Sequence, residues 1–127
     1  AKFSPNGQQM YGSYFFLKES GIKKIDRDSN NNIYLAGDVY QGYNITGNGT
    51  AGTHQQTLIG EGNTFLAKLD SNFQFLWGTY YGGRNAYGIQ HNYNEGRTIV
   101  RDLKVDKDNN VVLLGNTNAN ERISTPG

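Results

Sequence analysis

Short apolar runs alternate along this chain with polar turns rich in Asp and Asn. Each run is too short for a helix of ordinary length, and several alternate apolar and polar residues with a period of two, as a half-buried strand does. Two such runs joined by an Asx-rich turn are typical of a β-hairpin. The pattern therefore predicts hairpins along most of the chain, with the paired runs at residues 22–25 and 33–36, 63–69 and 73–81, and 103–105 and 111–114.

The chain also repeats itself in two places. Residues 1–14 align without a gap with residues 67–80, 66 positions later, and Ala1, Lys2, Asn6, Gln8, Gly12 and Tyr14 recur in the second copy. Residues 24–38 align with residues 104–116, 80 positions later, which places Asp26 opposite Asp106. Self-similarity in a fixed order indicates units that stack or are arranged radially.

The repeated unit contains four strands, expected at residues 22–26, 32–38, 63–70 and 73–81. We therefore predict an all-β fold built from four-stranded antiparallel propeller blades, with a β-sandwich of the same hairpins as the alternative. On this interpretation residues 1–20 are the outer strands of a preceding blade and residues 21–82 one complete blade. Residues 83–98 form an inter-blade insertion loop, and residues 99–127 the inner hairpin and start of the next blade. Remaining blades of a longer protein, or further copies of the chain, are needed to close the ring.

The composition argues against several classes of protein. Of 127 residues, 17 are Gly and 16 are Asn, which suits many tight turns and few helices. The net charge of +1 and the lack of a basic cluster argue against a nucleic-acid surface. No apolar run reaches membrane-spanning length. The absence of Cys excludes disulfides and thiol catalysis.

An ordered series of motifs resembles the β-propeller repeat family often called SBBP, named for seven-bladed propellers. The similar segments are GTHQQTLIGEGNT (52–64), FLAKLDSNFQFLWGTYYGG (65–83), IDRDSNNNIYLAGD, VDKDNNVVLLGN and ISTPG (123–127). In the first copy, residues 1–14, Tyr11 stands where the family has Trp. In the hairpins at residues 24–38 and 104–116, Asn stands where the family's turn has Gly before Asn. The resemblance implies a segment of a larger propeller in a bacterial secreted or cell-surface protein. It implies no single activity.

The prominent residues have structural interpretations beside functional ones. Trp77 is expected to pack between blades, and the alternative is an exposed ring that stacks on carbohydrate. The two acidic turns, at residues 26–30 and 106–110, place side chains with oxygen atoms at alternate positions, as calcium loops do. These side chains are therefore candidate Ca²⁺ ligands. The EF-hand continuation fails, and turn chemistry is the favoured interpretation, with no cofactor expected. The cation candidates are Asp26, Asp28, Asn30, Asp106, Asp108 and Asn110.

The segment at residues 85–98 is not explained by the repeat, because the second copy has 14 more residues than the first before Lys104. A surface excursion without a partner is the favoured interpretation, and the alternative is a surface that binds a protein or a cell-surface glycan through Tyr87, His91, Tyr93 and Arg97. No catalytic constellation is evident. The expected function is a non-catalytic extracellular scaffold. A carbohydrate-binding module, or part of an enzyme completed by missing blades, are the alternatives.

Overall fold

The computed structural model describes residues 1–14, 21–40, 49–85 and 96–124, and all the regular secondary structure in these residues is β-strand. Eight strands form three antiparallel sheets, and no described segment forms a helix that could cross a membrane. The strands are β1 (Lys2–Phe3), β2 (Gln9–Tyr11), β3 (Gly21–Arg27), β4 (Ile33–Tyr40), β5 (Gly62–Leu69), β6 (Phe75–Tyr81), β7 (Thr98–Val105) and β8 (Val111–Thr117).

The central sheet has four strands in the sequential order β3-β4-β5-β6, and each pairs with the next as an antiparallel neighbour. The most extensive pairing joins β4 to β5 over eight residue pairs, from Ile33↔Leu69 to Tyr40↔Gly62. These strands lie within two residues of their expected positions, because alternation and the Asx turns mark them in the sequence. The predicted all-β fold of four-stranded antiparallel units is confirmed.

Both faces of the central sheet are covered by apolar side chains. The first face carries Leu35, Val39, Phe65 and Tyr80, and Leu58 from the connection before β5 packs against it. The residues on the second face contact the β7–β8 hairpin, and they are Tyr34, Ala36 and Leu66, which meet Val100 and Leu103. A sheet buried on both sides requires near-continuous apolar strands. This accounts for the buried runs in β4 and β5.

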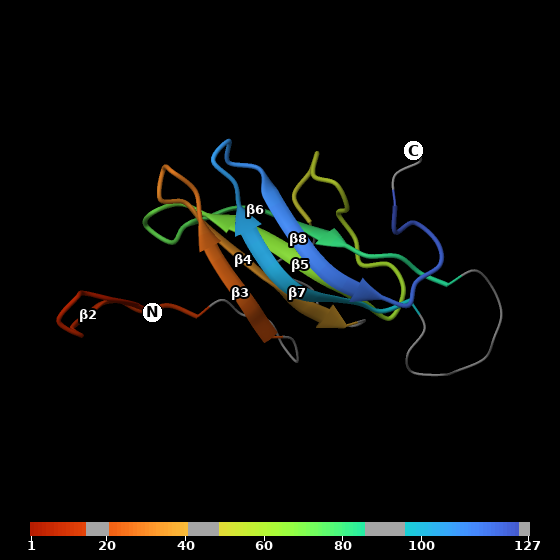
Figure 1. Cartoon of the computed structure of the whole chain (residues 1–127), viewed down its shortest axis with the longest axis horizontal. Coiled ribbons are helices and arrows are strands. Elements are labelled where there is room, and N and C mark those ends of the chain that lie inside the picture. Colours follow the sequence, from red (N-terminus) through yellow and green to blue (C-terminus); the bar gives the residue numbers. More distant parts are fainter. Residues whose placement is uncertain (15–20, 41–48, 86–95, 125–127) are drawn as a thin grey trace.

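The β7–β8 hairpin lies across the second face of the central sheet, as one blade stacks on another (Figure 1). Two carboxylates fix its position. Asp38, whose side chain is buried, accepts a hydrogen bond from the Val100 amide at 3.0 Å and is also bound by Lys23. Asp26 accepts a hydrogen bond from the Val105 amide at 2.9 Å. The two blades are therefore held in register at both ends of β7.

The β1–β2 hairpin projects from the central sheet at the left of Figure 1, away from β7–β8. Its Tyr11 ring stacks on Phe73, which packs against the first face, with ring centroids 4.4 Å apart. The hairpin repeats the geometry of β5–β6, because Lys2 pairs with Tyr11 as Lys68 pairs with Trp77, and a bulge follows in both. The offset of 66 positions in the sequence is thus also a structural equivalence.

The second equivalence differs from the one that the sequence suggested. Ile22 pairs with Gly37 and Val100 with Gly115, and each pair precedes a bulge, so β7–β8 repeats β3–β4 at an offset of 78 positions. The expected offset of 80, which equated Asp26 with Asp106, is wrong. Asp28 is the counterpart of Asp106, since both begin the hairpin turn. The connection that precedes β7 is consequently 12 residues longer than its counterpart before β3, and not 14 as the sequence suggested.

The outer edge of β6 is covered by the segment that includes Thr50 and Gln55. The Thr50 amide donates to the Gly78 carbonyl at 2.9 Å, and the Tyr80 amide donates to the Gln55 carbonyl at 2.9 Å. The Thr79 hydroxyl accepts from the Gln55 amide and donates to its carbonyl. The outward backbone groups of Gly78 and Tyr80 on this edge strand are thereby satisfied within the molecule.

Candidate interaction surface at the loop end

The connections between strands differ greatly at the two ends of the sheets. At one end, here called the turn end, the hairpin turns are short and alike. They begin at Ser4, Asp28, Asp70 and Asp106, and the first residue of each donates its amide to the carbonyl four residues on. The fourth residue has a positive φ, between 63° and 82°, at Gly7, Asn31, Phe73 and Asn109. The other end, called the loop end, carries the long connections 41–61 and 82–97.

The Asp side chains at the turn end stabilise the turns. Asp106 Oδ1 accepts the amides of Asp108 and Asn110 at 2.9 and 2.8 Å, and its Oδ2 accepts the Asn110 side chain at 3.0 Å. Asp70 accepts two backbone amides in the same way. These hydrogen bonds are the Asx-turn chemistry expected for the sequence. Among the described residues, no cluster of three or more His, Asp or Glu could hold a metal ion.

Asp28 is the one carboxylate of the described turns that is buried, and its side-chain partners belong to its own turn and to the central sheet. Its Oδ2 lies 3.2 Å from Lys68 Nζ and 2.8 Å from the Asn32 side chain, and its Oδ1 accepts the Asn30 and Asn32 amides. Burial alone would raise the pKa of Asp28, but the hydrogen bonds from Asn32, Lys68 and Asn30 together lower it from 3.8 to about 2. The ionised carboxylate is therefore the form that the fold requires.

Acid is expected to weaken the fold through Asp28. Because its pKa is lower in the folded chain than when unfolded, its contribution to stability is complete above pH 3.8 and is lost as the pH falls toward about 2. In Asp28→Asn the melting temperature should be lower at neutral pH and fall less steeply across this window. Thermal unfolding followed by circular dichroism between pH 7 and pH 2 measures both effects. Parallel pH profiles for the two proteins would contradict the assignment.

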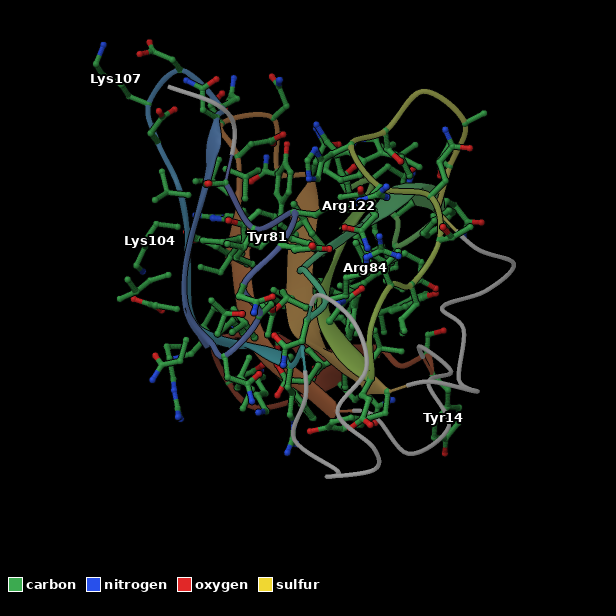
Figure 2. All side chains as sticks on the ribbon, turned by 90° about the vertical axis from the view of Figure 1, so that its right-hand side faces the viewer. Tyr14, Tyr81, Arg84, Lys104, Lys107 and Arg122 are labelled. Atoms are coloured by element: carbon green, nitrogen blue, oxygen red, sulfur yellow. The ribbon has the colours of Figure 1, made fainter. Side chains whose placement is uncertain are left out.

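Three chain segments cross at close range at the loop end. A Cβ on Gly60 would lie 2.7 Å from the Gly83 carbonyl oxygen and 2.9 Å from that of Gly96, so only glycine fits there. Beside them, Arg84 and Glu121 exchange backbone hydrogen bonds of 3.2 and 3.0 Å, and their side chains are 3.3 Å apart. Figure 2 faces this end, with Arg84 near its centre. The loop end is therefore anchored at the base of its long connections.

Arg97 joins the bases of both long connections. Its guanidinium carbon lies 4.4 Å from the centre of the Tyr40 ring, and its Nη2 donates to the Tyr40 hydroxyl. Its backbone amide donates to Asn118 Oδ1 at 2.7 Å. Its Nε is buried without a hydrogen-bond partner among the described residues. Arg97 thus holds the end of β4 against the start of β7, a role that the sequence did not indicate.

The other predicted binding residues, Tyr87, His91 and Tyr93, lie outside the described residues. Their contacts stay a prediction. Trp77 is half-buried, and its ring meets Tyr34 edge-on at 6.1 Å beside the apolar contacts to the next blade. This position supports the interpretation that Trp77 packs between blades. Asp26, Asp28 and Asn30 do not form one turn, because Asp26 lies in β3 and binds Val105.

Sequentially paired antiparallel strands and blade-on-blade stacking define a β-propeller-like repeat protein. The chain is 31% identical over 129 aligned positions to an uncharacterized WD repeat-containing protein of Acanthamoeba polyphaga mimivirus. The alignment covers 99% of this chain, which spans only 9% of the length of that relative. The similarity is consistent with a propeller fragment, since WD repeats form four-stranded blades.

The chain also departs from the usual WD pattern. Its one Trp, Trp77, is followed by Gly78, so no Trp-Asp dipeptide is present. The structural repeat spacing of 66 and 78 positions exceeds the ~40–45 residues of a WD repeat, and long connections lie at the loop end. No protein-family model matches the chain, so membership of the SBBP family stays a prediction. No solved structure matches it.

Proposed function

We propose that this segment is a non-catalytic β-propeller scaffold that binds a protein partner through its loop end. One observation carries the proposal: the described bases of the long connections are anchored together at one end of the sheets, while the opposite end has four similar tight turns. Loops that vary on a rigid framework are where binding residues concentrate. The similarity to a WD repeat-containing protein supports the same class of function.

The finer features of the proposal rest on the sequence. The family resemblance favours a secreted or cell-surface location in a bacterium, and the aromatic residues Tyr87 and Tyr93 suit either a protein or a glycan surface. A carbohydrate-binding module is the second candidate function. The half-buried Trp77, packed against Tyr34, is a poor sugar platform, so this candidate depends on the aromatics of the insertion.

Substitution of the insertion aromatics tests the proposal. The variant Tyr87→Ser/Tyr93→Ser should lose most of the proteins that the immobilised chain retains from a cell-surface extract, because aromatic anchors contribute most to such contacts. The matched control is Tyr14→Ser, since Tyr14 is 98% exposed and lies outside the insertion. It should retain the same proteins as the unaltered chain.

Equal retention by all three proteins would contradict the loop-end assignment, provided that their melting temperatures agree. A glycan array probed with the unaltered chain and with the double variant distinguishes a carbohydrate-binding module from a protein-binding scaffold. If the unaltered chain retains no proteins but binds a glycan, and the double variant does not bind that glycan, the partner is a carbohydrate and not a protein.

A further inference from the structure

The β8 strand lacks a neighbour that its counterpart β4 possesses. Within the described residues, β8 pairs with β7 alone, whereas β4 pairs with β3 on one side and β5 on the other. The 78-position equivalence makes β7–β8 the match of β3–β4, including the bulge and the hairpin turn. The free edge of β8 is therefore the edge to which a strand like β5 would bind.

The chain contains one further described hairpin of the β5–β6 kind, which is β1–β2. It shares the pairing register, the bulge and the turn geometry of β5–β6 at the 66-position offset. The observed pairs Tyr34↔Lys68 and Ile33↔Leu69 translate, through the two offsets, into Val112 opposite Lys2 and Val111 opposite Phe3. The edge and the hairpin are thus complementary in a defined register.

Apolar side chains are exposed both on β8 and on the β1–β2 hairpin. Val112 is 57% exposed and Leu114 is 65% exposed, whereas their counterparts Tyr34 and Ala36 are 2% and 0% exposed in the complete blade. Phe3 is 58% exposed, and its counterpart Leu69 is 6% exposed. Each position is buried only where the blade has four strands and a neighbouring blade. Exposed apolar surface of this kind indicates an interface.

The two surfaces of one chain cannot meet each other in this structure. The β1–β2 hairpin contacts Phe73, which packs against the first face of the central sheet, while β7–β8 covers the second face. The four-stranded sheet separates them. Pairing between them therefore requires two molecules.

We propose that β8 of one copy binds the β1–β2 hairpin of a second copy as an antiparallel neighbour, so that two copies complete one blade between them. The described strands of each copy form sheets of two, four and two strands, which together match the number in two four-stranded blades. Head-to-tail contacts of this kind close into a ring if the rotation between copies permits it. Propellers typically contain four to eight blades, so a closed ring holds two, three or four copies and an even number of blades. This inference goes beyond partner binding and does not depend on it.

Engineered disulfides test the register, because the chain has no Cys of its own. Two single variants, Lys2→Cys and Val112→Cys, are mixed and oxidised. Cross-strand neighbours have Cα atoms about 4.5–5.5 Å apart, which suits a disulfide. The mixture should give a disulfide-linked dimer containing one chain of each variant. The control replaces Val112→Cys with Asn116→Cys, a position on the same face of β8 but about 13 Å farther along it.

Sedimentation or light scattering of the unaltered 14.1 kDa chain should show two, three or four copies at micromolar concentration. The Tyr87→Ser/Tyr93→Ser variant should assemble equally well, so a failed partner-binding test leaves this result unaffected. A monomeric chain that gives no mixed disulfide would overturn the proposal and assign the β8 edge to a neighbouring repeat of a longer polypeptide. Equal cross-linking through Asn116→Cys would overturn the register.

Discussion

Replacement of Gly37 by alanine is expected to lower the free energy of unfolding by about 3 kcal/mol, the upper end of the usual cost of overpacking. Gly37 lies beside the bulge where β3 meets β4. An added Cβ would be 2.0 Å from the Gly21 carbonyl oxygen and 2.7 Å from the ring of Phe65, which is fully buried. Neither atom can move freely, because one belongs to a paired strand and the other to the core. Chemical denaturation measures the loss.

The chain supplies a matched control for this substitution. Gly115 is the counterpart of Gly37, and a Cβ there would lie 2.6 Å from the Ile99 carbonyl oxygen with no core side chain among its close contacts. It lies on the exposed strand β8, where the backbone can shift. Gly115→Ala should therefore cost only about 1 kcal/mol. Equal losses for the two variants would show that the Phe65 contact does not determine the effect.

The change Asn63→Asp is expected to destabilise the fold by more than about 3 kcal/mol, because it buries an unpaired charge. Asn63 is fully buried, and its Oδ1 accepts the Ile59 amide and the Gln55 side chain, each at 2.9 Å. Its Nδ2 donates to the Ile59 and Gly62 carbonyls at 2.8 and 2.9 Å. A carboxylate would present an acceptor to both carbonyls.

The pH dependence of this variant distinguishes charge from lost packing. Burial beside two carbonyl oxygens should raise the pKa of the introduced carboxyl, so the variant should regain stability as the pH falls through that raised value. The control is Asn30→Asp, since the equivalent position of the turn that begins at Asp106 already carries Asp108. Its stability at neutral pH should change by less than about 0.5 kcal/mol. A neutral-pH loss of the same size in both variants would contradict the role of Asn63.

The strands were predictable because each one is marked locally, by alternation within the run and by Asp or Asn at the turn. The register between repeats was less predictable for a physical reason. A shift of two residues along a strand returns every side chain to the same face, so the apolar pattern accepts either alignment. Asp26 and Asp28 differ by such a step, and only the hydrogen bonds reveal that Asp28 begins the turn.

The candidate site was predictable only in part. The unexplained insertion pointed to the region around Arg97, but the contact of Arg97 with Tyr40 joins residues far apart in the sequence. No local pattern predicts a contact of that kind, because it depends on how two strands meet at the loop end. The same limit applies to Asp38, which fixes the next blade through the amide of Val100.

The covered edge of β6 has a consequence for the behaviour of the protein in concentrated solution. The segment FLWGTYY at residues 75–81 is aromatic, uncharged and free of proline, the composition that favours amyloid-like cross-β stacking. The hydrogen bonds from the Thr50 and Gln55 segment occupy the backbone groups of Gly78 and Tyr80 that a fibril would need. The Thr50 and Gln55 segment therefore protects this strand, and its loss would expose an aggregation-prone sequence.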